Sequence, residues 1–462
     1  MSLESFVEEA RRIVGPRWVL VETWSLAGYA IDYWPLLVYR ALRDPRGALS
    51  RGPAAAVLPG SEEEVAALLE AAQRFGVRLA VYAGGSGVLG GAVPDEGWVV
   101  LDVARLDWVD WFDEEAGIVD AGAGAPLAEV EGWLNRRGWT LRHYPQSLPE
   151  ARIGGLVATR STGQYSTGYG GIEERVKGLH AAVPGVGLVR VKPSPRRSVL
   201  PPLEQLFTGS EGLLGVITRV YLEALPLPEC ELRVHWRPGS FREALGEARS
   251  LAQRRLAPDL YRIYDEQEAP VALGVEGPAA IGVYEGPCRV ARARLEAAAE
   301  LISSRVEVEE GEGPASRWLR ERFNVIASIA RLLEIGLAFD TIEFSAPWGS
   351  AARVYEAARS AALSVEGVAY VGVHASHFYP SGVALYMTFA FDAGRLEEVY
   401  GAVWDRVMRA VSSAGGSISH HHGIGRMRLP YLKLELGEEG ARLVARIKRA
   451  LDPQGILRGF PL

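Results

Sequence analysis

Three consecutive histidines, His420, His421 and His422, lie near the end of the 462-residue chain in the segment SISHHHGIG (417–425). Imidazoles can exchange protons, contact anions, bind metal ions or pack in a core. If the segment is a strand, His420 and His422 share one face and His421 points to the other. Zinc usually takes four ligands and mixes histidine with cysteine or carboxylate. The histidines alone leave acid–base chemistry, a metal site and packing open.

Glycine and hydroxyl side chains gather in three other segments, each beside a predicted strand: VYAGGSGVLGG (81–91), PQSLPEARIGGLVATRSTGQYSTGYGGIEERV (145–176) and GSEGLLGVI (209–217). The first contains a G-x-G-x-x-G pattern, GSGVLG, but the GAVPDEGWVVLDV that follows has no helical period. A nicotinamide-type dinucleotide loop has to open a helix, so that interpretation fails. Glycine-rich turns still present main-chain N–H groups to anions. Three such loops indicate a large phosphorylated cofactor bound along its length.

Short alternating elements surround these loops. Residues 54–82 predict a strand, a helix from the Ser61 N-cap to about Phe75 with Glu64 completing a capping box, and a second strand. The pattern then predicts strands at 97–103 and 117–124, a helix at 126–138 and a strand within 211–228. Amphipathic helices alternate with strands to about residue 410, and the last helix ends at Asp452-Pro453.

The composition is that of a globular protein with full hydrophobic cores, because 48% of the residues are hydrophobic and 23% are charged. The length predicts two or three domains. A net charge of −7 argues against a nucleic-acid surface. With only Cys230 and Cys288 present, we expect no disulfide framework and no thiolate metal cluster. No signal-like or membrane-length apolar run occurs, so we expect a cytoplasmic protein without a transmembrane segment.

The motifs occur in an order typical of one flavoprotein family. The glycine segments, together with EGLLGVIT (211–218) and SISHHHGIGRMRLPYLKLELG (417–437), resemble FAD-linked oxidases of the vanillyl-alcohol oxidase type, which bind FAD through a PCMH-type domain. This family includes glycolate and D-lactate dehydrogenases, and within it the closest likeness is to alkyldihydroxyacetonephosphate synthases. The resemblance covers about residues 20–460.

The resemblance implies an α+β fold with its active site between two domains. The expected parts are an N-terminal helical arm (1–52), a two-part FAD-binding domain (53–226), a cap domain with an antiparallel sheet flanked by helices (227–410), and a C-terminal segment (411–462) that returns to the flavin.

The resemblance also implies FAD in an extended conformation. The first loop would wrap the pyrophosphate, the second would lie against the ribityl chain and flavin, and the third would take the adenine side. The residues concerned are Tyr82, Ala83, Gly84, Gly85, Ser86, Gly87, Val88, Gly90, Gln146, Ser147, Gly154, Gly155, Ala158, Thr159, Arg160, Ser161, Gly163, Glu211, Gly212, Leu214, Gly215, Val216 and Ile217. Because the first loop lacks the histidine that joins some members covalently to FAD, we expect non-covalent FAD. Val81 and Gly87 replace a usual proline and serine, but main-chain donors survive both changes.

Tyr386 lies in HASHFYPSGVALYMTFAF (374–391), where apolar and polar residues partly alternate as on a strand. By resemblance it matches the catalytic acid/base of the synthases, a task that needs nearby cations or donors to stabilise a phenolate. Arg262 matches an arginine important for synthase activity, and Arg426 stands where the synthases have lysine. The expected catalytic residues are Tyr386, His420, His421, His422 and Arg262, and the expected substrate contacts are His374, His377 and Arg426.

One departure separates the chain from the synthases. They carry a substrate-binding arginine ahead of the stretch that here reads IEFSAPW (342–348). Counting back without a gap places Ile329 at that position, and Arg331 lies about 200° around a helix from it. The phosphate contact of the synthases is therefore expected to be missing.

Taken with these residues, the resemblance implies a FAD-dependent oxidoreductase that dehydrogenates a 2-hydroxy acid or related alcohol by hydride transfer. One alternative is the non-redox synthase reaction, which exchanges the fatty acid on dihydroxyacetone phosphate for a fatty alcohol. Another is a catalytically inactive FAD-binding protein. A divalent metal at the histidines is less favoured than acid–base chemistry. The expected partners are a small-molecule substrate, an unidentified electron acceptor and a second copy in a homodimer, without nucleic acid.

Overall fold

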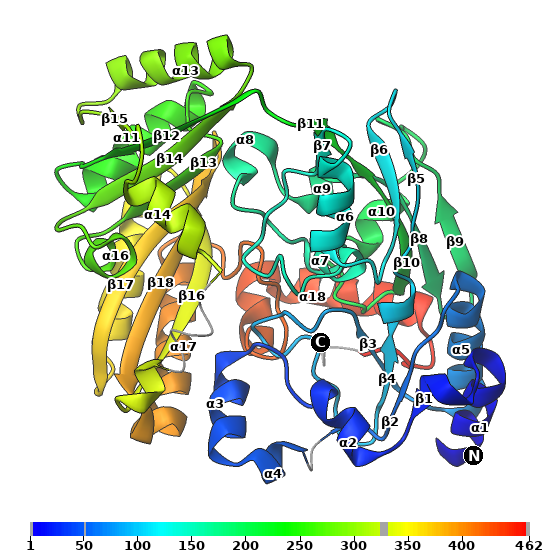
Figure 1. Cartoon of the computed structure of the whole chain (residues 1–462). Helices are drawn as coiled ribbons and strands as arrows, with labels where there is room; N and C mark the ends of the chain where they lie inside the picture. Colours follow the sequence, from blue (N-terminus) through cyan, green and yellow to red (C-terminus); the bar gives the residue numbers. More distant parts are fainter. Residues whose placement is uncertain (1–2, 50–51, 324–330, 459–462) are drawn as a thin grey trace.

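Two domains lie side by side, and the C-terminal segment runs from one across the middle of the other (Figure 1). The computed structural model describes residues 3–49, 52–323 and 331–458. We call the part built on the strands between residues 19 and 226 the N-terminal domain, and the part built on the strands between residues 230 and 392 the cap domain.

The N-terminal domain begins with a sheet that is four-stranded within the described ranges. Its order is β1-β2-β4-β3, with β1 (Val19–Leu20) antiparallel and with β2 (Ala55–Val57), β4 (Val99–Asp102) and β3 (Leu79–Tyr82) parallel to one another. The helices α1 (Leu3–Val14) and α5 (Glu62–Phe75) pack beside it. Ser61 caps α5 by accepting a hydrogen bond from the Glu64 N–H, as predicted, and Gly76 ends the helix at a φ of 68°.

An antiparallel sheet forms the other half of this domain, in the order β5-β6-β10-β8-β9. Its strands are β5 (Val109–Asp113), β6 (Ile118–Gly122), β10 (Val216–Glu223), β8 (Val176–Val183) and β9 (Gly187–Val191), and β7 (Trp139–Thr140) pairs separately with β11 (Leu225–Pro226). Its helices are α6 (Leu127–Asn135), α7 (Ile153–Thr159), α8 (Ser166–Tyr169), α9 (Ile172–Arg175) and α10 (Leu203–Phe207). One hydrophobic core joins both halves, because Phe6, Leu101 and Val220 belong to the same cluster of buried side chains.

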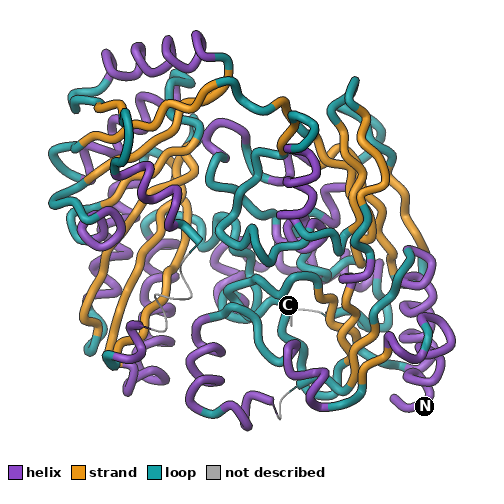
Figure 2. The backbone as a smooth tube through the Cα atoms, in the orientation of Figure 1, coloured by secondary structure: helices purple, strands orange, loops and turns teal. Residues whose placement is uncertain are grey.

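The cap domain is an antiparallel sheet flanked by helices (Figure 2), which confirms the predicted fold class. The strands follow the order β15 (Glu307–Val308), β12 (Cys230–Trp236), β14 (Ala279–Gly286), β13 (Leu260–Tyr264), β17 (Val368–Phe378), β18 (Gly382–Asp392) and β16 (Leu337–Pro347). The helices are α11 (Phe241–Gln253), α12 (Glu268–Leu273), α13 (Cys288–Leu301), α14 (Pro314–Glu321), α16 (Ala351–Leu363) and α17 (Leu396–Ser413). Phe344, Met387 and Trp404 lie in its core.

The C-terminal segment leaves the cap domain and returns to the N-terminal domain. Its helix α18 (Leu432–Leu451) ends at Asp452, as predicted. The Lys448 ammonium donates to Leu213 O at 2.8 Å, and the Leu79 N–H donates to Ile456 O at 2.7 Å. These bonds fix α18 to the third glycine-rich segment and Ile456 beside β3.

The N-terminal arm also connects the two domains. It holds α2 (Thr23–Leu26), α3 (Pro35–Arg43) and α4 (Pro45–Leu49). Tyr29 OH donates to Asp102 of the N-terminal domain at 2.7 Å. Trp34 Nε1 donates to Tyr400 OH at 3.0 Å, and Tyr39 OH donates to Phe339 O at 2.9 Å, both in the cap domain.

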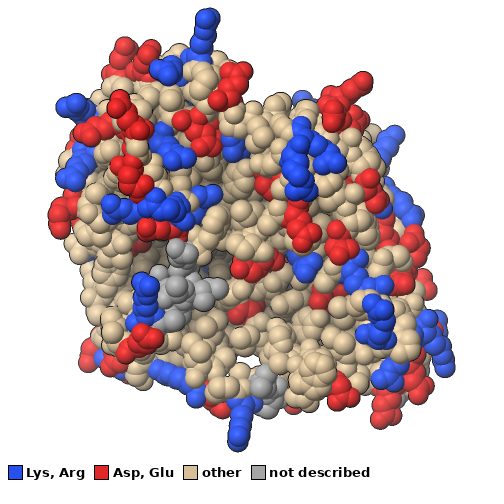
Figure 3. All heavy atoms as spheres, in the orientation of Figure 1, with Lys and Arg blue, Asp and Glu red and all other residues tan. Residues whose placement is uncertain are grey.

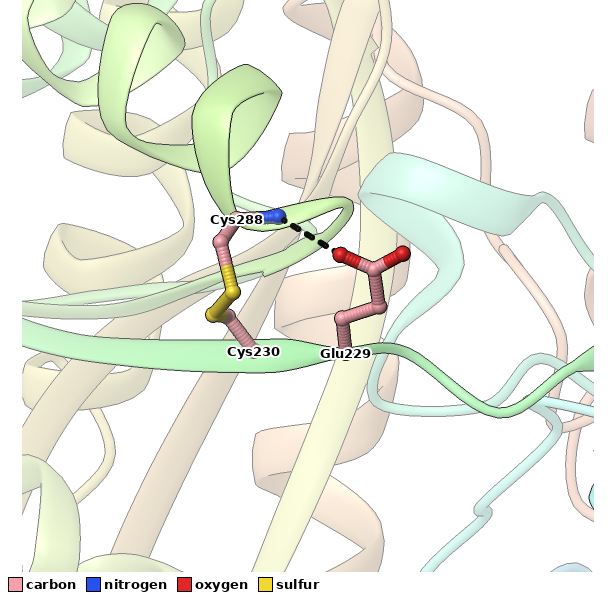
Figure 4. Close-up of a disulfide and its surroundings, with 3 residues drawn as sticks. All are labelled: Glu229, Cys230 and Cys288. Atoms are coloured by element: carbon pink, nitrogen blue, oxygen red, sulfur yellow. Dashed lines mark hydrogen bonds between the residues drawn. A yellow bond between two sulfur atoms is a disulfide. The ribbon is translucent and has the colours of Figure 1, made fainter.

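The two cysteines form one disulfide, which the expectation of no disulfide framework did not foresee. β12 and β14 pair with Cys230 opposite Gly286, and the chain turns into α13 two residues later. This places the Cys230 and Cys288 Cα atoms 5.2 Å apart. Figure 4 shows the bond joining β12 to the first residue of α13, beside Glu229, whose carboxylate accepts from the Cys288 N–H at 3.4 Å.

Acidic and basic side chains are intermixed over the face drawn in Figure 3. Within the described ranges, no helix combines the length and the apolar character that crossing a membrane requires.

Candidate active site

Tyr386 lies in the middle of β18 between two polar residues of the neighbouring strands. The register places it opposite His374 of β17 and opposite Glu343 of β16. Directly paired residues point to the same face of a sheet, so all three side chains lie on one face. The His374 ring stacks on the Tyr386 ring, with centroids 4.6 Å apart and planes inclined by 9°.

His377 occupies a distorted part of β17. The register shifts between Ser376 and Phe378, and His377 has a φ of 55°, which is unusual for a residue other than glycine. The distortion brings His377 Nε2 to 2.7 Å from Tyr386 OH and His377 Nδ1 to 2.5 Å from Ser166 Oγ. Ser166 belongs to α8 of the N-terminal domain, so this hydrogen-bonded chain crosses from one domain to the other. Strain of this kind commonly occurs at functional sites.

Residues 418–425, the histidine loop, have no regular secondary structure, so the strand-like alternation expected for the three histidines is wrong. His421 Nδ1 lies 3.5 Å from Tyr386 OH and 2.9 Å from His420 Nδ1. His420 Nε2 lies 2.8 Å from Tyr379 OH. Hydrogen bonds therefore link six side chains in the order Ser166, His377, Tyr386, His421, His420 and Tyr379. We call this series the hydrogen-bonded ring, because its two ends, Tyr379 and Ser166, lie close together. His422 is not in this ring.

A single buried carboxylate fixes the histidine loop. Glu343 accepts from the main-chain N–H groups of all three histidines, at 2.6 Å from His420, 3.2 Å from His421 and 2.7 Å from His422. Arg428 Nη1 donates to Glu343 Oε1 at 3.0 Å, and neither side chain is exposed. The same guanidinium donates to Gly423 O at 3.0 Å. Three donors converging on one acceptor cannot occur in a regular strand, which explains the irregular backbone.

The charge states follow from burial and from these partners. Burial lowers the pKa of His377 and of His421 well below the usual range, so both imidazoles are neutral at pH 7. Burial and the Glu343 carboxylate raise the pKa of Tyr386 well above the usual range. Burial also raises the pKa of Glu343, but the attraction of Arg428 and of the nearby histidines outweighs it and lowers that pKa well below the usual range.

The remaining expected residues, Arg262 among the catalytic ones and His374 and Arg426 among the substrate contacts, divide between two places. Arg262 of β13 pairs with Ser376 of β17, so it lies on the strand beside His374 and His377. His374 lies beside Tyr386, with its Nδ1 3.5 Å from Glu268. Arg426 points to the first glycine loop instead, where it contacts Asp95 at 2.6 Å and Val93 O at 2.9 Å. Ile329 lies outside the described residues.

Sequence reasoning missed Glu343, Arg428, Ser166, Tyr379 and Glu268 as members of the site. Glu343 carried one usable signal, an acid inside the apolar run IEFSAPW, because buried carboxylates are rare unless paired. The others stand in ordinary polar contexts, and only the fold brings them to Tyr386.

The three glycine loops meet at one place in the N-terminal domain. A Cβ on Gly84 would lie 2.3 Å from Glu150 O, and one on Gly155 would lie 3.3 Å from the Cβ of Ala83, so the first two loops are in contact. The Glu211 N–H donates to Ala158 O at 2.8 Å and joins the third loop to the second. The Glu211 carboxylate accepts from Ile424 and Gly425, at 2.6 and 3.0 Å, and joins the third loop to the histidine loop.

This arrangement fits FAD. In the described part of the chain, the main-chain N–H groups of residues 84–88 donate no hydrogen bond to a protein acceptor. They form a set of free donors on a glycine-rich turn, which suits a diphosphate. Gln146 and Ser147, together with the stretch from Gly154 to Gly163, belong to the second loop, which leads to Ser166 at the start of α8. The cofactor and the hydrogen-bonded ring would therefore adjoin along this loop.

Two groups of side chains come close enough to share a cation: His377, His420 and His421 in one, and Glu343, His421 and His422 in the other, with the donor atoms within 4.8 Å of one another. Both nitrogens of His377 and of His420 already lie within hydrogen-bonding distance of protein groups. This favours the hydrogen-bonded network over a metal centre.

Comparison with known proteins gives two family matches. Residues 53–191 match the FAD binding domain model, and residues 228–458 match the model for FAD linked oxidases, C-terminal domain. Together with the fit of the glycine loops, these matches identify FAD as the cofactor.

Similar proteins span nearly the whole chain. The FAD-linked oxidoreductase YgcU of Escherichia coli (strain K12) is 29% identical over 99% of this chain and 98% of its own. Alkyldihydroxyacetonephosphate synthase of Trypanosoma brucei brucei is 24% identical, with 98% and 79% covered. Glycolate oxidase subunit GlcD of Bacillus subtilis (strain 168) is 22% identical, with 88% of each chain covered.

Solved structures show the same fold. An alkyldihydroxyacetonephosphate synthase superposes with a TM-score of 0.83 at 21% identity, covering 99% of this chain and 85% of that one. p-Cresol methylhydroxylase with substrate bound gives a TM-score of 0.81 at 15% identity, covering 98% and 95%.

Proposed function

This chain belongs to the FAD-linked oxidases, and on that premise we propose that it dehydrogenates a 2-hydroxy acid or a related alcohol with non-covalently bound FAD. The observation that carries the proposal is the hydrogen-bonded chain from Ser166 through His377 to Tyr386, with an unpaired arginine on the neighbouring strand. FAD, when bound, supplies the acceptor for a hydride. The remaining tasks, binding the anion and taking the hydroxyl proton, belong to the protein.

Arg262 is suited to the carboxylate of a hydroxy acid. Its Nε donates to Tyr264 OH at 2.7 Å, and its guanidinium lies 4.7 Å from the centroid of the Trp318 ring. Among the described residues, no carboxylate forms an ion pair with it. Its charge also contributes to lowering the pKa of His374 and His377, after burial. A partly buried arginine without an acidic partner favours an anionic substrate group.

The proton of the substrate hydroxyl can leave through Tyr386. Because burial raises the pKa of Tyr386, its phenol keeps a proton at neutral pH and cannot itself act as a resting base. His377 is neutral and lies 2.7 Å away, so it can accept the phenol proton while the phenol oxygen takes the proton of the substrate. Ser166 at His377 Nδ1 fixes which imidazole nitrogen is free to accept. The carbinol carbon then loses hydride and becomes a carbonyl.

The test is anaerobic bleaching of the flavin by a panel of 2-hydroxy acids, each compared with the alcohol that lacks the carboxylate. We expect bleaching by a hydroxy acid, a rate that is ~10²–10⁴-fold lower in Tyr386→Phe, and a higher half-saturating concentration in Arg262→Met. Tyr284→Phe is the matched control, because Tyr284 is a buried tyrosine of the same sheet that donates to Leu256 O. Release of free FAD by acid tests non-covalent binding.

The second candidate is a synthase-type exchange without net redox. It is supported by the likeness to alkyldihydroxyacetonephosphate synthases over nearly the whole chain. If no hydroxy acid bleaches the flavin, and an acyl-dihydroxyacetone phosphate with a long-chain alcohol gives an ether, this candidate replaces the first. Bound FAD with neither reaction would indicate a binding protein without catalysis.

A further inference from the structure

Arg428 of the Glu343–Arg428 ion pair makes several hydrogen bonds in addition to its ion pair with Glu343. Both side chains are fully buried, and Arg428 also donates to Glu343 O at 2.5 Å and to Ser419 Oγ at 3.1 Å. A buried ion pair stabilises a fold weakly, because desolvation of the two charges offsets their attraction. Well-packed apolar residues could fill the same place. The presence of two charges at this buried place therefore points to a task that needs charge.

The groups next to the ion pair, which are the three histidines, indicate what this task is. The Glu343 carboxylate lies under the main-chain N–H groups of the three histidines, and His422 Nδ1 lies 3.8 Å from its Oε1. An anion in this position favours protonated imidazoles, while the guanidinium of Arg428 disfavours them. The two charges act on the same rings with opposite sign. The balance between them adjusts histidine pKa values that burial has already lowered.

We propose that the Glu343–Arg428 ion pair is a positioning pair, which holds the histidine loop against Tyr386 and sets how readily its imidazoles take up a proton. The inference rests on the proposed function, since it assigns a role within the same acid–base network. Among the described residues, neither side chain hydrogen-bonds the Tyr386 phenol, so both position it through the histidines, while the Glu343 charge also raises the pKa of Tyr386 directly.

Other groups also face the histidine loop and contribute to its electrostatic environment. They come from the cap sheet, from the third glycine loop and from α18. The titratable and charged members are Arg262, His374, His377, Tyr379, Tyr386, Glu211 and Glu435. All of them remain unchanged in the variants below, so differences between variants report on the pair.

The sign of the effect differs between the two residues. In Glu343→Gln the amide can still accept from the loop, but the anion is lost, so the histidine pKa values fall. In Arg428→Met the cation is lost, so those pKa values rise. For a charge within about 4–6 Å, each shift should amount to about 1 unit or more. A pair with only a packing role would lower the melting temperature in both variants and leave the titrations where they are.

The experiment is an NMR titration of the FAD-loaded protein labelled with ¹⁵N-histidine, in the wild type and in both variants. We expect opposite shifts for the loop histidines, and a matching opposite displacement of the acid limb in the pH profile of flavin reduction. Asp340→Asn is the control, because Asp340 is another buried carboxylate of β16, bonded to Tyr400 and Trp404. It should lower stability without moving the loop histidines.

The outcomes separate this inference from the proposed function. Shifts of the same sign, or no shifts, with flavin still bound would overturn the inference even if hydroxy acids bleach the flavin. If Arg428→Met does not fold, Arg428→Lys should restore both folding and the wild-type titration, and failure to restore the titration also overturns it. Opposite shifts of the histidine pKa values without bleaching of the flavin by any hydroxy acid would support the inference about the ion pair and rule out hydroxy acids as substrates.

Discussion

Tyr386 and Glu343 are directly opposite each other across β18 and β16, on the same face of the cap sheet. The phenol of Tyr386 meets His377 and His421, whereas the carboxylate of Glu343 meets the main chain of the histidine loop. The tyrosine and the histidines are thus held by one sheet. A rigid scaffold of this kind positions reacting groups better than a free loop would.

The first prediction concerns His421 and His422. His421 belongs to the hydrogen-bonded ring and His422 does not. His421→Phe should therefore lower the rate of flavin reduction by ~10²–10⁴-fold, and His422→Phe should lower that rate much less. Stopped-flow absorbance with matched FAD content measures both. Equal losses would contradict the ring, and activity that a chelator abolishes and one divalent ion restores would indicate a metal centre instead.

The second prediction concerns stability at low pH. His143 is buried, and burial followed by the nearby Arg175 lowers its pKa to about 3. The unfolded chain, with a histidine pKa near 6.5, binds the extra proton first as the pH falls, so the native state loses stability between about pH 6.5 and pH 3. His143→Leu should remove up to ~2 kcal/mol of the difference in unfolding free energy between pH 7 and pH 5. Urea denaturation at the two pH values measures it, and an unchanged difference would refute the assignment.

The third prediction concerns the disulfide. Cys230 and Cys288 are separated by 58 residues, a loop whose closure restricts the unfolded chain by about 4 kcal/mol in the chain-entropy model. Replacing both cysteines with serine should lower the free energy of unfolding by up to that amount. Dithiothreitol should reproduce the loss in the wild type and leave the double variant unaffected. A wild type insensitive to reduction would show that the bond contributes little.

The fourth prediction concerns the first glycine loop. In Gly84→Ala the new methyl group would lie 2.3 Å from Glu150 O, a main-chain atom that cannot move aside cheaply. The contact between the first two loops should open and FAD should be lost, which flavin absorbance after gel filtration measures. Gly246→Ala on α11 is the control, since nothing lies within 4 Å of its added carbon. Retention of FAD by Gly84→Ala would place the cofactor elsewhere.

Local features of the fold could be predicted from the sequence, and distant ones could not. The helix from Glu62 to Phe75 is specified by Ser61, Glu64 and Gly76, all adjacent to it, and the structure has it where the pattern predicts it. The histidine loop depends on Glu343, which lies 77 residues before His420. A periodic pattern of residue types cannot predict a contact between two residues so far apart in the sequence. The strand pattern assumed for the histidines failed for that reason.

The candidate site shows the same division. The stretch from His374 to Phe391 reads as one partly alternating strand, but the structure divides it into β17 and β18 with a turn between them. That turn is what places His377 beside Tyr386. The partnership of Ser166 with His377 spans 211 residues and two domains, and the disulfide depends on the register of β12 and β14. Residue types could be selected from the sequence, but the bonds between them required the fold.

The hydrogen bond between Ser166 and His377 has a consequence for evolution and for engineering. In a chimera joined at the boundary between the two domains, one parent would supply Ser166 and the other parent would supply the remaining five members of the ring. If the cap domain alone is transferred, His377 will lie next to the α8 of the other parent. Chimeras should therefore be functional only when the segment from Ser166 to Tyr169 and the cap domain come from the same parent. In shuffled libraries of such enzymes, the active members should carry these two parts together.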